Sequence, residues 1–145
     1  MRIISANIQL DTSAGVSVVN ITKRIMELLE DSNINNGQLT VFTCHTTTGI
    51  AINECEERLQ KDILVHFEII TPKVKHYMHD DISLRDCPAN ERKNGDAHIK
   101  AIGMSTSQTI PIQHGKLLLG RWQSILFFDF DGARKREIII QVLGE

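Results

Sequence analysis

Cysteine, aromatic residues and long apolar runs are all scarce in this chain of 145 residues. The three cysteines, Cys44, Cys55 and Cys87, are odd in number and lack CxxC spacing, which argues against a disulfide framework and against a thiolate zinc cage. We therefore expect a protein of the reducing cytoplasm. A chain of this length can bury one hydrophobic core, so we expect a single domain over residues 1–145.

The chain also lacks an excess of charge of either sign. Its 16 Lys and Arg residues nearly balance its 18 Asp and Glu residues, for a formal net charge of -2. Such a chain has no overall electrostatic field that would attract it to nucleic acid or to anionic lipid. Residues 1–10 alternate in polarity and do not form the apolar run of a signal peptide or membrane span. We expect no nucleic-acid partner and no membrane association.

The common catalytic motifs are missing as well. The sequence contains no GxGxxG, GxxxxGK[ST], GxSxG or HExxH pattern. Dinucleotide-binding, P-loop, serine-hydrolase and zincin functions are therefore without support. The function has to be inferred from less common groupings of polar residues.

Strand and helix periods alternate along the chain. Ile4 to Leu10 are apolar at every second position, which predicts a strand, and a turn follows. From Val18 the apolar residues take helical spacing, with Ser17 as the cap and Asn35-Asn36-Gly37 as the stop, so we expect an amphipathic helix. A second helix begins near Asn53 and ends before Pro72.

The remaining segments are expected to be a long loop, a short helix and further strands. Residues 71–95 lack apolar periodicity and are rich in His and Asp, which indicates either a functional loop, best suited to act as a lid, or a disordered segment. Asp131-Gly132 between two apolar runs predicts a type I′ hairpin. The fold class is α+β, with a mixed β structure and two main helices. The expected strands are 39–44, 46–52, 109–113, 116–119, 122–130 and 138–142, and residues 96–104 form a helical turn.

The first candidate site begins with His45. It is followed by Thr46, Thr47, Thr48 and Gly49, which together offer an imidazole, three hydroxyl groups and a residue that permits close backbone approach. Such a set can hold an oxyanion or a phosphate. The alternative is that the threonines are strand formers and the histidine is structural.

His98 forms the second candidate, together with Asp96. On an extended segment the two side chains would share a face and the carboxylate would orient the imidazole, whereas on a helix they would diverge. Asp96 is equally suited to cap a helix. His76 and His79, beside Asp80 and Asp81, have a spacing compatible with a metal site or with a solvated loop.

Other polar residues have weaker claims to a role. Glu54 and Asp62 are placed on one flank of the second helix, where they line a groove or form ordinary surface ion pairs. We interpret His66 as a packing residue, His114 as exposed in a turn, and Arg121 as a candidate anion clamp. The run Arg134 to Arg136 is interpreted as a solvated strand start.

Taken in order, the sequence motifs resemble the YjbQ family, also called UPF0047, over nearly the whole chain. The motifs are His45-Thr46-Thr47-Thr48-Gly49, Asn53-Glu54, Asp62, His79-Asp80, His98-Ile99-Lys100, Gly120-Arg121-Trp122-Gln123, Asp131-Gly132-Ala133-Arg134 and Leu143-Gly144-Glu145. Three positions depart from the family pattern, which often has Glu at Asp129, proline at Ala133 and Thr at Arg121.

The resemblance implies a compact α+β subunit that assembles as a homotrimer with polar sites near the subunit boundaries. It implies a catalytic site of His45, Glu54, Asp62 and His98, with Thr46 to Thr48 holding the ligand. His45, His79 and His98 are the implied metal ligands, and the group at this place is a metal or an anion.

The family is associated with a secondary thiamine-phosphate synthase activity, which joins a pyrimidine diphosphate to a thiazole phosphate. In such a transferase a divalent cation would stabilise the departing pyrophosphate. Zn²⁺ would favour the histidines, and Mg²⁺ would favour Glu54 and Asp62. Two alternatives remain open: a metal- or ligand-binding trimer without turnover, and another metal-assisted enzyme that acts on a phosphorylated metabolite.

Overall fold

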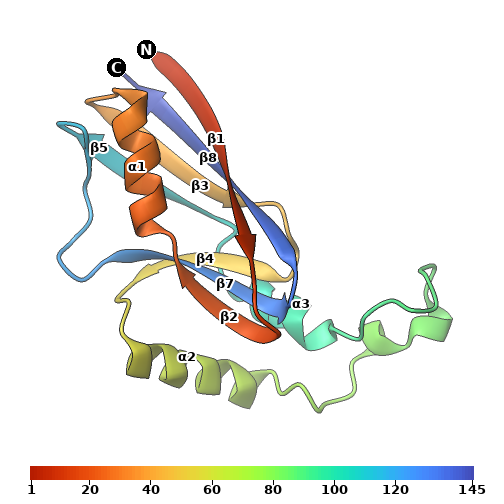
Figure 1. Ribbon diagram of the computed structural model, residues 1–145. Helices are drawn as coiled ribbons and strands as arrows, with labels where there is room; N and C mark the ends of the chain where they lie inside the picture. Colours follow the sequence, from red (N-terminus) through yellow and green to blue (C-terminus); the bar gives the residue numbers. More distant parts are fainter.

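Two antiparallel sheets and three helices make up the computed structural model, which describes all of residues 1–145 (Figure 1). The predicted α+β class is confirmed. The larger sheet has the strand order β1 (Arg2–Asp11), β8 (Lys135–Gly144), β3 (Gly37–Thr43), β5 (Ser107–Gln113) and β6 (Lys116–Leu117). The smaller sheet has the order β2 (Gly15–Asn20), β7 (Ser124–Gly132) and β4 (Thr48–Asn53). The helices are α1 (Thr22–Ser32), α2 (Glu57–Ile70) and α3 (Gly95–Ile102), with short 3₁₀ turns at Met78–Asp80 and Ile82–Leu84.

Strand β7 is the centre of the smaller sheet and is buried on both faces. Ile125 and Phe127 point into the main core, which also contains residues of α1 and of the larger sheet. Leu126, Phe128 and Phe130 point the other way and pack with two alanines of α3. A strand covered on both sides is apolar at nearly every position, which explains the unbroken run of this segment.

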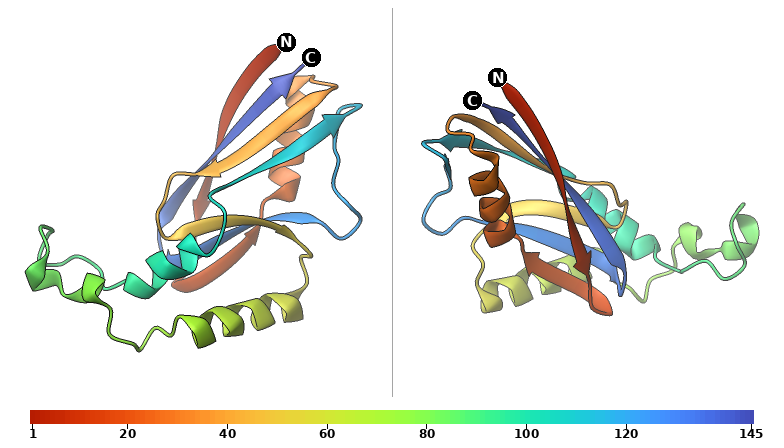
Figure 2. Two further views of the ribbon diagram at one scale, coloured as in Figure 1. Left: turned by 180° about the vertical axis from the view of Figure 1, so that it is seen from behind. Right: turned by 45° about the horizontal axis from the view of Figure 1, so that its top comes forward.

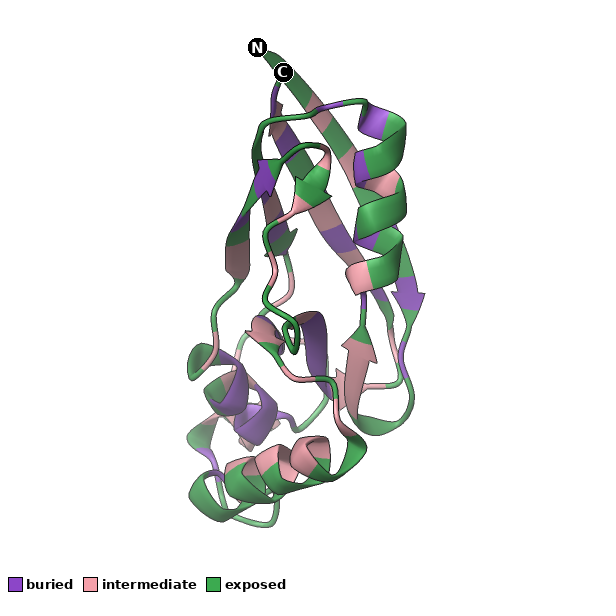
Figure 3. Cartoon of the chain, turned by 90° about the vertical axis from the view of Figure 1, so that its left-hand side faces the viewer, coloured by how far each residue is buried: buried purple, intermediate pink, exposed green.

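The helices differ in how deeply they are buried. Helix α1 lies against the larger sheet and buries Ile25 and Leu29 (Figure 1). Helix α2 lies along the smaller sheet and has no buried residue, although Phe67 packs edge-on against Phe130 (Figure 3). Residues 71–94 then extend away from both sheets as an arm (Figure 2). No helix in the structure is both long enough and apolar enough to cross a membrane.

The first predicted helix begins later than expected, because a strand precedes it. Val18 and Val19 belong to β2, where they pair with Phe128 and Phe127 of β7. Helix α1 therefore starts at Thr22, whose backbone N–H donates to the side chain of Asn20 at 3.0 Å. At the other end Asn33 takes the left-handed conformation, so the helix stops before the predicted Asn-Asn-Gly run.

The predicted hairpin at Asp131-Gly132 is wrong. Strand β7 continues through Gly132, and β7 and β8 belong to different sheets, so they form no hairpin. The two consecutive residues with positive φ are instead His114 and Gly115, which join β5 to β6 as a type I′ turn requires. His114 is exposed in this turn, as predicted.

Candidate functional site

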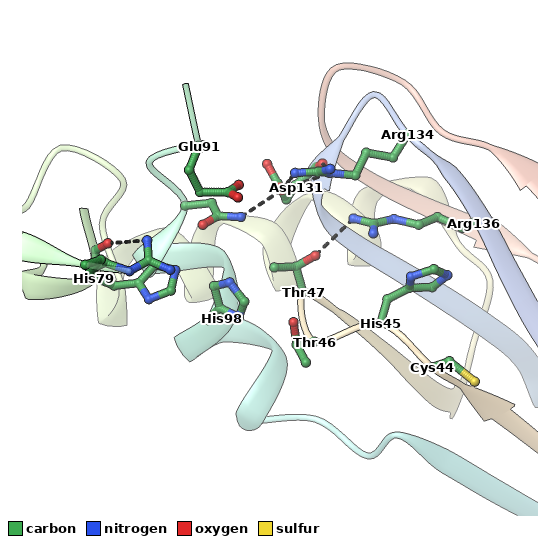
Figure 4. Close-up of a pocket in the computed structure, with 12 residues that line it drawn as sticks. Cys44, His45, Thr46, Thr47, His79, Glu91, His98, Asp131, Arg134 and Arg136 are labelled. Atoms are coloured by element: carbon green, nitrogen blue, oxygen red, sulfur yellow. Dashed lines mark hydrogen bonds and ion pairs between the residues drawn. The ribbon is translucent and has the colours of Figure 1, made fainter. Parts of the chain in front are cut away.

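An open cavity of about 380 Å³ lies where the two sheets meet the arm and α3 (Figure 4). Three imidazoles and three guanidinium groups line it, with only one hydrophobic residue in the wall. The lining residues are Cys44, His45, Thr46, Thr47, His79, Arg85, Glu91, Asn94, His98, Asp131, Arg134 and Arg136. The cavity is therefore built to hold a polar ligand.

The connection between β3 and β4 carries the predicted His-Thr-Thr-Thr motif and is held rigidly. The hydroxyl groups of Thr43 and Thr48 lie 2.7 Å apart, and the Thr48 hydroxyl donates to the carbonyl of His45 at 3.1 Å. The Thr47 hydroxyl accepts a hydrogen bond from Arg136. Of the three threonines only Thr46 is exposed, so Thr46 is the one whose hydroxyl is free to meet a ligand.

His45 is fixed by one of its ring nitrogens. Its Nε2 atom accepts a hydrogen bond from the backbone N–H of Glu137 at 3.0 Å, so the proton of the neutral ring is on Nδ1. Partial burial lowers the pKa of His45, and the nearby Arg136 cation lowers it further, while Asp129 and Glu137 oppose the shift. The ring is therefore neutral near pH 7 and presents an N–H donor.

His98 and His79 form a pair on the opposite side of the cavity. Their ring centroids lie 4.6 Å apart in an edge-to-face arrangement. Partial burial lowers the pKa of His98, and the adjacent His79 lowers it further, while Asp131 and a hydrogen bond to the Thr46 backbone oppose the shift. His98 comes from α3 and His79 from the arm, so this contact ties the arm to the site.

A buried ion pair lies beneath the cavity. Arg136 donates two hydrogen bonds to Asp129, from Nε at 2.8 Å and from Nη2 at 2.7 Å. Thr12 also donates to Asp129, at 2.7 Å. These donors lower the pKa of Asp129 even though burial acts to raise it. Because Arg136 is 6% exposed, its interpretation as part of a solvated strand start is wrong.

A second polar cluster forms the rim. Asp131 accepts from Asn94 at 2.9 Å, from Arg134 at 2.7 Å and from Arg92 at 3.2 Å. These three donors lower the pKa of Asp131 against the opposing effect of burial. Asp131 and Arg134, the first and last residues of the Asp131-Gly132-Ala133-Arg134 motif, thus line the cavity, although the hairpin predicted at this motif does not exist.

The structure brings some of the predicted site residues together and separates others. His45, His79, His98, Thr46 and Thr47 all line the cavity. Thr48 does not line this cavity, and neither do Glu54 and Asp62. Glu54 precedes α2, which starts at Glu57, so the prediction that it shares a helix with Asp62 is wrong. The catalytic roles of these residues stay predictions.

Asp96 does not orient His98. Both residues lie on α3, where side chains two positions apart diverge, and Asp96 instead accepts a hydrogen bond from the buried Lys100 at 2.9 Å. Asp96 is not the helix cap either, because Asn94 holds that position.

Three further residues with predicted roles lie outside the cavity. His76 lies on the arm, with its Nε2 atom at hydrogen-bond distance, 2.9 Å, from a carboxylate oxygen of Asp81. His66 is exposed on α2 and makes an edge-to-face contact with Phe67, so it packs at the surface and not in the core. Arg121 stacks on Trp122, with its guanidinium carbon 4.8 Å from the ring, and does not reach the cavity.

Sequence reasoning gave no site role to seven of the cavity residues. They are Cys44, Arg85, Glu91, Asn94, Asp131, Arg134 and Arg136, of which Asp131 and Arg134 appeared within a family motif. These residues come together only through contacts between segments that are far apart in the sequence. One signal was nevertheless present, because Asp129 interrupts an otherwise apolar strand and a buried carboxylate requires a cationic partner.

The donor set of a single chain does not fit a metal ion. No group of three or more His, Cys, Asp or Glu side chains is arranged to hold one. The cavity contains three guanidinium groups instead, and guanidinium groups bind carboxylates and phosphates. The geometry within one chain therefore suits an anion better than a cation.

The buried ion pair yields a stability prediction. Arg136→Met should lower the free energy of unfolding by about 3–5 kcal/mol, because Asp129 would be left buried and unpaired. The double variant Asp129→Leu with Arg136→Met should recover part of this loss. Urea unfolding of both variants, with the exposed neighbour Lys135→Met as the control, measures the effect. Equal losses for Arg136→Met and Lys135→Met would contradict the assignment.

The cavity histidines yield a pH prediction. Folding lowers the pKa of His45 and of His98, so below about pH 6.5 the unfolded chain binds more protons than the folded chain. Stability should therefore fall as the pH drops from about 6.5 through the folded pKa values. Thermal melts from about pH 7 to about pH 5 should show a smaller loss in the variant His45→Gln with His98→Gln than in the wild type or in His66→Gln. Identical pH profiles would rule out this coupling.

The chain is similar to proteins from archaea and bacteria. The family model described as "UPF0047 protein YjbQ-like" matches residues 6–145. A UPF0047 protein of Methanothermobacter thermautotrophicus is 38% identical over 145 residues, which cover 100% of this chain and 95% of the relative. The crystal structure of a YbjQ-like protein of unknown function from Sulfolobus solfataricus has a TM-score of 0.88 at 31% identity, and the match covers 99% of both chains. A Clostridium acetobutylicum structure of the yjbq/upf0047 family has a TM-score of 0.84 at 37% identity, with 95% of this chain and 99% of that chain covered. The chain therefore belongs to the UPF0047 YjbQ-like family.

Proposed function

We propose that the cavity binds the phosphate or diphosphate group of a small phosphorylated metabolite. The observation that carries the proposal is the gathering of Arg85, Arg134 and Arg136 around one polar cavity. Arg134 and Arg136 each pair with an aspartate, but Arg85 forms no ion pair and donates only to the carbonyl of His79, at 2.8 Å. Arg85 is therefore the uncompensated cation that a ligand phosphate would neutralise.

The neutral groups of the cavity support the same ligand. The Nδ1–H of His45 and the hydroxyl of Thr46 are hydrogen-bond donors that do not require a change of protonation to meet an anion. Phosphate oxygens accept several such bonds at once. A mixture of cationic and neutral donors is consistent with a ligand of high negative charge.

The reaction proposed for this site is thiamine-phosphate synthesis, and the family resemblance is its main support. The ring nitrogen of the thiazole phosphate would attack the methylene carbon of the pyrimidine diphosphate, and the bond from that carbon to the diphosphate oxygen would break. Pyrophosphate then leaves with the bonding electrons. Guanidinium groups around the cavity would stabilise the charge on this leaving group. No step of this proposal runs through a divalent metal, because the donors of one chain form no metal cluster. The metal ligands that the family resemblance implies stay a prediction.

A ligand-binding protein without turnover is the alternative, and one observation favours it. The Nε2 atom of His45 is occupied by the backbone of Glu137, so the neutral ring offers the cavity a proton donor and no base. Because neutral His45 cannot accept a proton from a ligand, the site is better suited to ligand binding than to acid–base catalysis. His98 is then the only one of the two predicted catalytic imidazoles available for proton transfer.

We also propose that the chain forms the homotrimer implied by the family. The arm extends away from the sheets and exposes Val74, Met78 and Leu84, and α2 exposes Val65 and Ile69. Exposed apolar side chains on extended segments are typical of subunit contacts. If Glu54 and Asp62 act at the site, they would have to come from a neighbouring subunit, because they lie outside the cavity of their own chain.

Phosphate binding can be tested directly by calorimetry with pyrophosphate. Arg85→Gln should weaken binding about tenfold or more, because a charge-assisted hydrogen bond is lost. The matched control is Arg58→Gln, which removes an exposed arginine of α2. Pyrophosphate affinity that is absent in the wild type, or equal in both variants, would contradict the proposed site.

The reaction is then tested with the wild-type protein and both thiamine precursors. Release of pyrophosphate only when the thiazole phosphate is present would support the synthase. Binding of the pyrimidine diphosphate without any release would favour the alternative of a binding protein.

The homotrimer predicts a particle of three times 16.4 kDa by light scattering. Met78→Ser with Leu84→Ser should shift the population toward smaller species, because both side chains are exposed on the arm of the single chain. The control is Met26→Ser on α1. A wild-type protein that is monomeric at micromolar concentration would contradict the proposal.

A further inference from the structure

A second cavity, of about 340 Å³, adjoins the first at the β3–β4 connection. The two cavities share His45, Thr46 and His98, which therefore stand between them. The other residues of the second cavity are Thr48, Ala101, Ile102, Met104 and Thr106, from β4, α3 and the segment that follows α3. In Figure 4 the side chains of Thr46 and His98 lie next to each other at this boundary.

The wall of the second cavity is held in place by the backbone. The carbonyl of Ser105 accepts a hydrogen bond from Ile50 of β4 at 2.8 Å, and the carbonyl of Thr106 accepts one from Thr43 at 3.0 Å. Met104 packs directly over Gly49, where an added Cβ would lie 2.7 Å from the Met104 Cβ. The glycine thus leaves room for the methionine, and the apolar wall is formed before any ligand arrives.

The two cavities differ sharply in chemistry. The first is lined by arginine and carboxylate side chains, whereas the second has no Lys, Arg, Asp or Glu in its wall. The hydroxyl of Thr48 is already engaged with Thr43 and with the His45 carbonyl. A sugar placed against Met104 and Ala101 would leave several hydroxyl groups without partners, which costs free energy. A compact apolar or flat aromatic group would lose nothing there.

We propose that the second cavity binds the non-phosphorylated part of the same ligand, so that the site selects phosphate esters of a compact apolar or aromatic group. The inference rests on the proposed function, since the phosphate occupies the first cavity. Ligand pockets are commonly apolar with a few placed polar groups, and only the two cavities together have that composition. Thr46 and the two shared histidines lie beside the bond that joins the halves of the ligand.

The test compares phenyl phosphate with inorganic phosphate by calorimetry. Phenyl phosphate should bind the wild-type protein about tenfold more tightly, because the ring leaves water for the apolar wall. Glucose 6-phosphate should bind no more tightly than inorganic phosphate. Met104→Ser should remove most of the preference for phenyl phosphate and leave the affinity for inorganic phosphate unchanged. Ile102→Ser, at an exposed rim position, should reduce the preference without a risk to folding.

The controls separate this inference from the proposed function. Met26→Ser on α1 should leave both affinities unchanged, and Arg85→Gln should weaken both. If inorganic phosphate binds but phenyl phosphate binds no more tightly, this inference fails and the proposed function stands. If neither phosphate binds, both fail. If both Met104→Ser and Ile102→Ser keep the preference for phenyl phosphate, the second cavity has another role and the inference is overturned. The same conclusion follows if Ile102→Ser lowers the particle mass of the protein without reducing this preference.

Discussion

The buried ion pair between Asp129 and Arg136 is the polar junction on which the candidate site depends. Asp129 lies on β7 of the smaller sheet and Arg136 on β8 of the larger sheet, so the pair crosses from one sheet to the other. Arg136 also donates to Thr47, and Asp129 accepts from Thr12. Because charges buried in a protein must be paired and hydrogen-bonded, these four segments are held in one arrangement.

The ion pair also sets the electrostatics of the cavity. The Arg136 cation contributes to lowering the pKa of His45, and partial burial is the larger cause. His98 is neutral for a similar reason, since burial and the adjacent His79 both disfavour its charged form. A site with fixed guanidinium groups and neutral imidazoles keeps its donors in place near pH 7. This arrangement can receive an anion without first rearranging its protons.

The arm and α3 complete the site from the other side. His79 and Arg85 come from the arm, and His98 from α3. The arm is anchored near the cavity, where Asp80 accepts a hydrogen bond from the backbone N–H of Gly95 at 2.9 Å and the hydroxyl of the buried Tyr77 donates to Pro72. The segment predicted to be a functional loop or disordered is therefore held at its base by hydrogen bonds, which positions two cavity residues. The exposed apolar side chains of Val74, Met78 and Leu84 alternate along the sequence with these anchoring residues.

The sequence by itself determined the fold class and the alternation of strands and helices, because short-range periods carry that information. Local polar motifs marked His45 and His98 as separate candidates, and the family resemblance implied that they share one site. The tertiary structure decided which charges meet. Thr47 and Arg136 are 89 positions apart, and local spacing gives no sign that they hydrogen-bond. The same limit explains two incorrect predictions, the hairpin at Asp131-Gly132 at the end of β7 and the solvated position of Arg136 at the start of β8. A strand does not reveal which sheet it will join, since the choice depends on long-range pairing and shared burial. Helical spacing likewise predicts Glu54 and Asp62 on one flank of the second helix, but that helix begins only at Glu57, with Glu56 as its cap.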